Sequence, residues 1–488
     1  MNNDIQTLGA LKASGYKYRT LTEELRSNLI QKIKSGDKVF DNIIGYDDTV
    51  IPELERAVLA GHSINFLGLR GQGKTKMARL LVQLLDEYVP VIAGSVLNED
   101  PLQPITSASV KLIKEKGDET PITWWHRSDR YAEKLATPDV NIADLIGDID
   151  PIKAAHLKLS LSDEEAINYG IIPRSNRGLF VINELPDLQP RIQVALFNLL
   201  QEGDLQIRGH KFRVPMDVQF VFTSNPEDYT NRGSIITPLK DRIQSQIYTH
   251  YPESNLVGRT ITKQEVKKQK GQEKIVVPEV IEKLIEQIAI EARKSEFIDA
   301  KSGVSARLPI SAYENILSSV ERRMLINGDK AGTARIGDLT AAIPAIIGKI
   351  EMVYEGEQEG APNVARHLIS KAIRSIAPDY FENIDQLSNK RAPQELKEEY
   401  LQMTSWFESG NQIDITNEMP QLEYEKALNS IEGIHEKVKE VTSVVAEQAV
   451  FKEFLLTALA AFSILERKDL RRSVSFQDYF SSVVGGLN

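Results

Sequence analysis

Residues 64–85 read INFLGLRGQGKTKMARLLVQLL. The apolar run at 64–67 predicts a buried strand, and the run at 76–85 predicts a helix. Between them, residues 68–75 match the pattern G-x-x-x-x-G-K-[ST] at every fixed position. A strand, a glycine-rich turn and a helix in this order form the setting in which this pattern binds phosphate groups. The segment therefore predicts a nucleotide-binding α/β fold.

The residue types in this turn suit the binding of ATP and Mg²⁺. Glycines let backbone N–H groups close around phosphates, and the helix that follows points its positive end at the anion. The Lys74 ammonium would neutralise the β- and γ-phosphates, and the Thr75 hydroxyl would bind Mg²⁺. The predicted nucleotide-binding residues of this segment are Gly68, Arg70, Gly71, Gln72, Gly73, Lys74, Thr75 and Lys76.

Three further apolar segments extend the pattern. VPVIAGS at 89–95, GLFVINEL at 178–185 and VQFVFTSNP at 218–226 are predicted as the second, third and fourth strands. Continuous apolar strands that alternate with helices indicate a parallel sheet covered on both faces. The alternating sequences LQIR and KFRV flank Gly209 and His210, and they predict a β-hairpin just before the fourth strand.

Composition narrows the possible functions. The chain of 488 residues has a net charge of −10, which disfavours a general nucleic-acid or membrane-surface binder because phosphate groups need a basic face. It holds no cysteine, so disulfides and cysteine nucleophiles are excluded. The N-terminus lacks the apolar core of a signal peptide, and the longest apolar stretch, 454–465, is too short to span a membrane. We expect a cytoplasmic protein with no membrane span and no nucleic-acid partner.

Several short motifs accompany the phosphate-binding turn, in a fixed order. They are IIGYDD at 43–48, RSNRG at 174–178, GLFVINEL at 178–185, TSNP at 223–226, PLKDRI at 238–243 and GVSAR at 303–307. As a set, over residues 35–350, they resemble AAA+ ATPases of the MoxR and magnesium-chelatase motor-subunit (ChlI/BchI-like) group. The predicted hairpin and the run 143–184 also resemble features of that group. The resemblance implies hydrolysis of ATP to ADP and phosphate.

The resemblance also implies three catalytic residues. Glu184 ends the third strand at the position of the glutamate that polarises and orients the attacking water. Asn225 matches the residue that holds this water or the γ-phosphate. Arg242 matches the arginine finger, which reaches the γ-phosphate bound by a neighbouring subunit. A further arginine, Arg232 in the sequence YTNRGS, is interpreted as a solvated loop residue.

Three more residues match positions that contact the nucleotide. Ile44 and Gly45 belong to the segment that packs near the adenine in this group. Arg307 matches the arginine that touches the bound nucleotide from a helical lid. These contacts are expectations carried over from the resemblance, residue by residue.

One position departs from the group. The third strand of these ATPases normally ends in Asp-Glu, whereas this chain has Asn183 followed by Glu184. With Thr75, Asn183 is the expected metal-site residue, but its amide lacks the charge of an aspartate. We therefore expect weaker Mg²⁺ binding or slower hydrolysis, without complete loss of either.

The predicted architecture is a P-loop NTPase αβα sandwich with a parallel sheet, followed by helices. An N-terminal helical extension covers 1–35, the AAA+ core 36–250 and the helical lid 251–350. An all-helical C-terminal domain, 351–488, has no recognised role and is expected to set the choice of partner.

The leading functional hypothesis is a motor or chaperone that hydrolyses ATP in a ring, a homo-hexamer, and remodels a partner protein. The resemblance suggests a partner with a von Willebrand A-type domain. A first alternative is the motor subunit of a magnesium or other metal chelatase. A second alternative is a nucleotide-dependent scaffold with weak turnover, because of Asn183.

Overall fold

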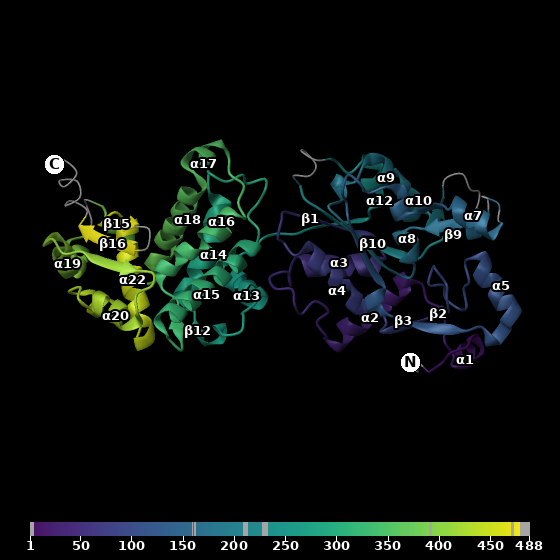
Figure 1. Ribbon diagram of the computed structural model, residues 1–488, viewed down its shortest axis with the longest axis horizontal. Helices are drawn as coiled ribbons and strands as arrows, with labels where there is room; N and C mark the ends of the chain where they lie inside the picture. Colours follow the sequence, from purple (N-terminus) through teal and green to yellow (C-terminus); the bar gives the residue numbers. More distant parts are fainter. Residues whose placement is uncertain are drawn as a thin grey trace. The chain divides into compact units, whose positions relative to one another are not determined.

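The computed structural model describes residues 4–158, 160, 163–207, 213–226, 233–389, 393–469 and 473–478. The chain divides into two compact units, Met1–His250 and Tyr251–Asn488 (Figure 1). Each unit is described separately below. The finer domain limits expected from the sequence stay predictions.

A five-stranded parallel sheet is the centre of the first unit, with the strand order β11-β1-β10-β7-β4. All neighbouring strands in it run parallel. A parallel sheet needs crossover connections, and these are supplied by helices (Figure 1). The predicted α/β fold is thus confirmed. The strands are β1 (Ile64–Leu67), β4 (Tyr131–Leu135), β7 (Gly178–Asn183), β10 (Val218–Ser224) and β11 (Ser245–Tyr248).

Alternate residues of β7 face two different hydrophobic cores. Leu179 and Val181 pack in a cluster with residues of α2 (Leu21–Ser35), α3 (Val50–Ala60) and α4 (Lys74–Leu80). Phe180 and Ile182 pack in a second cluster with residues of α9 (Pro190–Ala195), α10 (Phe197–Gln201) and α12 (Thr237–Arg242). Because neighbouring side chains of a strand point to opposite faces, the sheet lies between two helical layers. This arrangement is the predicted αβα sandwich.

The assignment of VPVIAGS to the parallel sheet is wrong. This segment does form a strand, β2 (Tyr88–Ile92), but β2 pairs antiparallel with β3 (Ile122–His126) in a separate two-stranded sheet. The position beside β7 belongs to β4, whose sequence YAEKL is polar. An edge strand does not need a continuous apolar run. Pro90, which lacks a backbone N–H, is itself a sign that β2 is not a central strand.

The predicted hairpin is confirmed by the antiparallel pairing of β8 (Asp204–Gln206) with β9 (Arg213–Pro215). Its tip at Gly209 and His210 lies outside the described residues, and so does Arg232. The other helices and strands of this unit are α1 (Leu8–Ala13), α5 (Ser107–Lys116), α6 (Ile142–Leu145), β5 (Gly147–Ile149), α7 (Pro151–Leu157), β6 (Ile167–Tyr169), α8 (Ile171–Arg174), α9 (Pro190–Ala195), α10 (Phe197–Gln201) and α12 (Thr237–Arg242).

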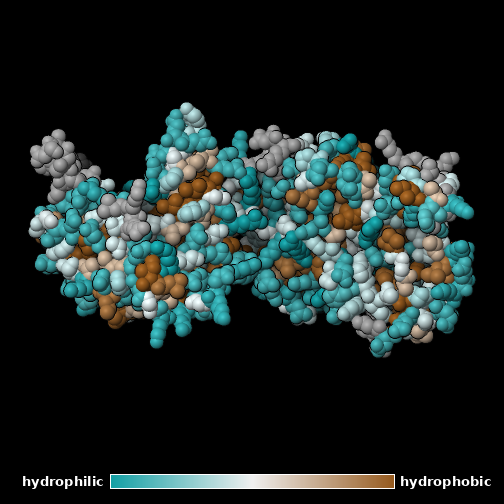
Figure 2. All heavy atoms as spheres, in the orientation of Figure 1, coloured by the Kyte–Doolittle hydropathy of each residue, from teal (hydrophilic) through white to brown (hydrophobic). Residues whose placement is uncertain are grey.

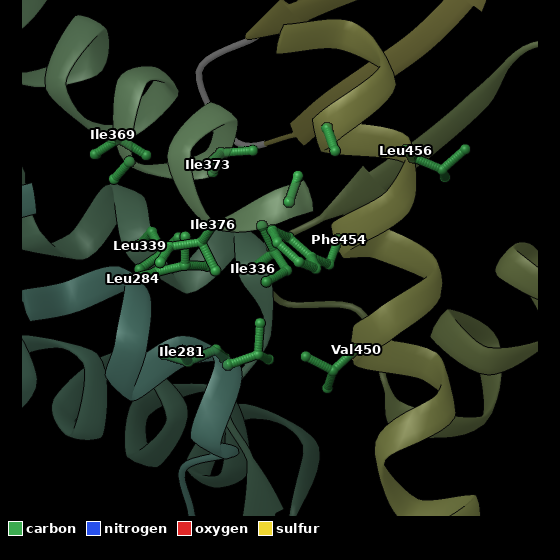
Figure 3. Close-up of a cluster of buried hydrophobic side chains, with 14 of the residues drawn as sticks. Ile281, Leu284, Ile336, Leu339, Ile369, Ile373, Ile376, Val450, Phe454 and Leu456 are labelled. Carbon is green, nitrogen blue, oxygen red and sulfur yellow. The ribbon is translucent and has the colours of Figure 1, made fainter. Parts of the chain in front are cut away.

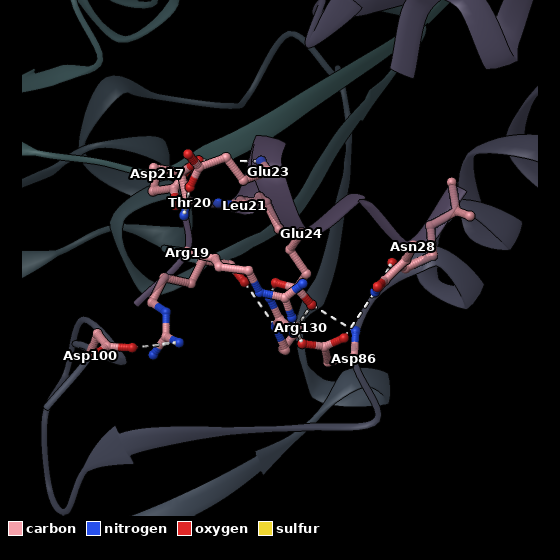
Figure 4. Close-up of polar contacts among 12 residues, drawn as sticks. Arg19, Thr20, Leu21, Glu23, Glu24, Asn28, Asp86, Asp100, Arg130 and Asp217 are labelled. Carbon is pink, nitrogen blue, oxygen red and sulfur yellow. Dashed lines mark hydrogen bonds and ion pairs between the residues drawn. The ribbon is translucent and has the colours of Figure 1, made fainter. Parts of the chain in front are cut away.

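The N-terminal extension is fixed to the sheet by a buried ion pair (Figure 4). The Arg130 guanidinium, just before β4, donates to both carboxylate oxygens of Glu24 on α2, at 2.7 and 2.6 Å. Both side chains are buried. Nearby, the backbone N–H of Leu21 donates to Asp217 at 2.6 Å, and burial raises the pKa of that carboxyl. Helix α2 is therefore part of the first unit's core.

The second unit is mainly helical around one hydrophobic core (Figure 3). In that figure, Ile281 and Leu284 of α14 lie opposite Val450 and Phe454 of α22. This core contains residues of both the predicted lid, 251–350, and the predicted C-terminal domain, 351–488. The helices are α13 (Asn255–Glu265), α14 (Glu279–Lys294), α15 (Arg307–Asn327), α16 (Ile343–Ile347), α17 (Tyr354–Glu359), α18 (Ala361–Ile376), α19 (Gln394–Glu408), α20 (Gln421–Asn429), α21 (Ile434–Val441) and α22 (Val445–Ala461).

The C-terminal region is helical, as expected, but it is not all-helical. A three-stranded antiparallel sheet, in the order β14-β16-β15, lies within it. Its strands are β14 (Ile413–Thr416), β15 (Leu465–Asp469) and β16 (Ser473–Asp478). Outside this sheet, β12 (Ile275–Val276) pairs with β13 (Gly332–Thr333). The sequence IDIT alternates between buried apolar and more exposed residues, and SVSFQD begins with alternating polar and apolar residues, which is the period of a strand. That signal was available in the sequence and was missed.

Hydrophilic residues cover most of the surface on the face shown in Figure 2, and apolar residues form small separate patches there. Among the described residues, no helix combines the length and the apolar character that a membrane crossing requires.

Candidate functional site

The predicted site residues of the first unit other than Arg242 lie around the point where three parallel strands end. β1 leads into the turn at 68–73, β7 ends at Asn183, and β10 is followed by Asn225. In the register of the sheet, Leu67 pairs with Ser224, so these strand ends lie side by side. Parallel strands carry their carboxyl ends to one edge, which is the usual place of a ligand site in an open α/β sheet.

The glycine-rich turn has the backbone geometry that its sequence predicts. Gly71 and Gly73 have φ of 75° and 74°, in the left-handed region that favours glycine. A Cβ atom at Gly68 would lie 2.0 Å from the Thr249 hydroxyl oxygen and 2.2 Å from Gln72 Oε1. Only glycine therefore fits at position 68 while Gln72 and Thr249 keep their places.

Lys74, the first residue of α4, joins the turn to the end of β10. Its Nζ donates to the carbonyl oxygen of Leu69 at 2.9 Å and to Asn225 Oδ1 at 2.7 Å, and it also donates to the carbonyl of Gly68. The ammonium is thus held over the turn by neutral oxygens. Phosphate oxygens are charged acceptors and form stronger bonds with an ammonium than carbonyl oxygens do.

Asn183 is held by two threonine hydroxyls. Thr75 Oγ1 and Thr223 Oγ1 each donate to Asn183 Oδ1 at 3.1 Å. Thr223 Oγ1 in turn accepts the backbone N–H of Glu184 at 3.2 Å. Glu184 itself has φ of 57° and ψ of 50°, a left-handed conformation that is uncommon for a residue with a side chain.

This donor set suits Mg²⁺, which prefers oxygen ligands. A hydroxyl and an amide oxygen meet at the strand ends, on Thr75 and Asn183, and the carboxylate residue Glu184 follows Asn183 directly in the chain. Both hydroxyls donate to Asn183 Oδ1. An aspartate at position 183 would have a second carboxylate oxygen where Asn183 has its amide nitrogen. This nitrogen is a hydrogen-bond donor and carries no negative charge.

The segment IIGYDD lies against the same turn. The Tyr46 hydroxyl donates to the carbonyl oxygens of Gln72 at 2.9 Å and of His250 at 2.7 Å. Ile44 and Gly45 precede it, both half-buried, and Gly45 has φ of 81°. The predicted adenine segment and the predicted phosphate segment are therefore brought together.

The other predicted residues of the turn differ in exposure. Arg70 is exposed and Lys76 is half-buried on the first turn of α4. The Gln72 side chain points inward, where its Oε1 accepts the Thr249 hydroxyl at 2.7 Å. Sequence reasoning missed Thr249, which closes the turn from the end of β11, and no motif marks it.

Arg242 lies at the C-terminal end of α12 and contacts α10. Its Nε donates to Gln201 Oε1 at 3.0 Å, and its Nη1 donates to the Pro238 carbonyl at 2.7 Å. The guanidinium lies over the Phe197 ring, 4.7 Å from the centroid. The structure thus groups Arg242 with α10 rather than with the residues around Lys74.

Arg307 belongs to the second unit, where it is exposed and begins α15. Its backbone N–H donates to the Ser305 hydroxyl at 3.1 Å. Its contact with a nucleotide stays a prediction.

Residues of the motif RSNRG form contacts that hold two parts of the first unit together. Arg177 is buried and forms an ion pair with Asp100 at 3.0 Å, and it donates to the Pro90 carbonyl at 2.8 Å. Asn176 donates to the Leu97 carbonyl at 2.9 Å. These residues attach the β2–β3 sheet to the start of β7.

Comparison with known proteins gives three kinds of similarity. Residues 156–246 match the family described as the sigma-54 interaction domain. The magnesium-chelatase 38 kDa subunit of Rhodobacter capsulatus is 26% identical over 222 residues, which cover 44% of this chain and 57% of that protein. Subunit ChlI of the chloroplast magnesium chelatase of Nicotiana tabacum is 26% identical over 221 residues, covering 44% and 48%.

Among solved structures, a magnesium-chelatase complex of subunits BchI and BchD contains a chain with 20% identity and a TM-score of 0.34. The alignment covers 65% of this chain and 98% of that one. The chain spans about half the length of the curated relatives it matches.

Proposed function

We propose that this chain, an AAA+ ATPase of the magnesium-chelatase and MoxR-like group, hydrolyses ATP within a ring of identical subunits and thereby remodels a partner protein. The partner carries a von Willebrand A-type domain. The observation that supports the proposal most directly is the contact of Lys74 with Asn225, at 2.7 Å, across the edge of the parallel sheet.

In the proposed reaction, each residue of this edge has one task. Lys74 exchanges its carbonyl contacts for the β- and γ-phosphates, and Asn225 is released to hold the attacking water. Glu184 orients and polarises that water as a general base. Thr75 would hold Mg²⁺, which would supply stabilisation of the negative charge on the phosphates.

Asn183 makes this ATPase slow. Its oxygen is already bonded to Thr75 and Thr223, so the amide fixes the Thr75 hydroxyl without adding a negative charge near the metal. Charges close to a bound cation affect its binding strongly. The same feature keeps a second possibility open, a nucleotide-dependent scaffold with weak turnover.

A chelatase motor subunit is the alternative that the sequence comparisons favour. Relatives matched at 26% identity are magnesium-chelatase subunits. A copurifying large partner that binds a tetrapyrrole would support this alternative, whereas a smaller partner with a von Willebrand A-type domain would support remodelling.

The ring arrangement can be tested through Arg242, which we propose acts on the nucleotide of a neighbouring subunit. Arg242→Ala should bind ATP normally and hydrolyse it poorly. Mixing it with Glu184→Gln subunits should restore part of the activity, because some interfaces then pair an intact Glu184 with an intact Arg242. Lys240→Ala is the matched control, an exposed cation on the same helix.

If Arg242→Ala hydrolyses ATP as fast as the wild type, the finger assignment is wrong. If isolated monomers are as active as the assembled protein, the proposal of a shared site fails as well.

A further inference from the structure

The first unit contains a cavity of about 490 Å³ that is separate from the candidate ATP site. It lies between the loop after β2, helix α5 and the segment that leads through β6. Figure 1 shows α5 and α7 at the same end of this unit. None of residues 68–75 lines the cavity. Its volume falls in the range of roughly 300–1,000 Å³ that is usual for small-molecule sites.

Much of the cavity lining is apolar. Aliphatic side chains come from all three surrounding segments, so the apolar surface is assembled by the tertiary fold rather than by one helix face. Such a surface favours a ligand with an apolar body, because its binding releases water from both partners. The apolar lining residues are Ile92, Ala93, Val96, Ala108, Leu112 and Ile167.

Two acidic residues of the wall, Glu99 and Glu164, accept hydrogen bonds from other residues of the wall. Glu99 is fully buried and accepts the hydroxyls of Ser95, Thr106 and Ser109 at 2.9, 2.8 and 2.7 Å. Glu164 accepts the backbone N–H of Ser107 at 3.1 Å and also its hydroxyl. These bonds join α5 to both neighbouring segments, so they hold the cavity in shape.

Two basic residues of the lining are bonded to neutral oxygens. Lys153 donates to the Ile167 carbonyl at 3.3 Å, and Arg174 donates to the Asn168 side-chain oxygen at 3.1 Å. Within the part of the chain that is described, neither forms an ion pair. The remaining lining acid, Glu165, is exposed. The cavity thus offers two cations that retain donors for a ligand.

We propose that this cavity binds a small organic anion with an apolar body, such as an aromatic or branched aliphatic carboxylate. The apolar body lies against α5, and the anionic group accepts hydrogen bonds from Lys153 and Arg174. Charge-assisted hydrogen bonds of this kind are stronger than neutral ones. The proposal goes beyond the ATPase function and does not depend on it.

The test uses the full chain and two fluorescent probes of nearly the same shape. Anilinonaphthalene sulfonate carries an anionic group, and phenylnaphthylamine is its uncharged counterpart. The wild type should bind the sulfonate at one site, at least tenfold more tightly than the uncharged probe. The double variant Lys153→Gln/Arg174→Gln should lose this preference and weaken sulfonate binding at least tenfold. Lys111→Gln, on α5 but outside the cavity lining, should bind like the wild type.

A second variant, Ala108→Trp, fills the cavity and should abolish binding of both probes. The charge variants alter exposed side chains, so they test the proposal even if Ala108→Trp does not fold. Equal sulfonate affinity in the wild type and the double variant would overturn the proposal. Equal affinity of the wild type for the two probes would overturn it too.

Discussion

Two polar clusters, one in each unit, use similar hydrogen bonds in very different surroundings. The edge cluster of the first unit consists of Lys74, Thr75, Asn183 and Asn225. Lys74 Nζ donates to the Leu69 carbonyl and to Asn225 Oδ1, and three of the four side chains of the cluster are half-buried. Because these side chains are partly exposed, the members of the edge cluster can exchange partners with a ligand at low cost.

The interior cluster of the second unit consists of Arg323, Arg335, Asp338, Tyr424 and Glu453. Arg323 donates to both oxygens of Asp338, at 2.8 and 3.0 Å. Glu453 accepts the Tyr424 hydroxyl at 2.7 Å and the backbone N–H of Ile336 at 2.9 Å. Burial raises the pKa of the Glu453 carboxyl.

The two clusters differ in what happens when one member is removed. Asp338 and Glu453 are each 3% exposed, so water cannot replace a lost partner. At the edge cluster, water or a ligand can replace a lost hydrogen-bond partner. We infer that the interior cluster supports folding and that the edge cluster supports function.

The largest expected effect is on folding. Asp338→Ala leaves the buried Arg323 charge without its carboxylate, and it should lower the free energy of unfolding by about 3–5 kcal/mol. Urea unfolding of the full chain, followed by circular dichroism, measures this change. Arg322→Ala is the control, because Arg322 lies next to Arg323 on α15 and its ion pair with Glu418 is largely exposed, so that it should contribute less than about 1 kcal/mol. Equal losses in the two variants would contradict the comparison.

The next effect is on turnover. Glu184→Gln keeps the shape of the side chain and removes the carboxylate, so ATP hydrolysis should fall by about two orders of magnitude. ATP binding, measured by calorimetry, should be retained. Glu202→Gln, which alters an exposed glutamate of the same unit, controls for the loss of one negative charge. A Glu184→Gln protein with unchanged turnover would exclude Glu184 from catalysis.

A somewhat smaller effect is expected on nucleotide binding. Lys74→Ala removes both the charge for the phosphates and the link to Asn225, and it should weaken ATP binding at least tenfold. Unfolding free energy should change little, because the lost contacts are half-exposed. Calorimetry measures the ATP affinity of Lys74→Ala and of the control variant Lys111→Ala, in which the substituted side chain is exposed. Equal ATP affinity would refute the phosphate-site assignment.

The smallest effect concerns Asn183. Asn183→Asp adds a negative charge beside Thr75, so the Mg²⁺ concentration for half-maximal ATPase activity should fall several-fold. Titration of activity with Mg²⁺ measures it. If only the aspartate variant is active, the scaffold hypothesis gains support. If the wild type already reaches full ATPase activity at a low Mg²⁺ concentration, the Asn183 amide is sufficient for Mg²⁺ binding.

The sequence predicted much of the first unit. The family resemblance and the α/β fold are confirmed, and so is the hairpin before β10. Two assignments were wrong, the place of residues 89–95 in the parallel sheet and the all-helical C-terminal region. Both errors came from judging strands by apolar content, which overlooks the polar edge strand β4 and the alternating sequences of β14 and β16. The roles of the individual site residues stay predictions.

What the sequence determined by itself is local. The glycines at 68, 71 and 73 and the lysine that follows specify the turn and the start of α4, because backbone freedom and helix initiation depend on neighbouring residues. The tertiary structure alone decided which distant residues meet. Lys74 reaches Asn225 only because β1 and β10 are adjacent strands, and the cavity beside α5 exists only because three segments pack around it. Strand order and packing depend on the whole core, and no short stretch of sequence specifies them.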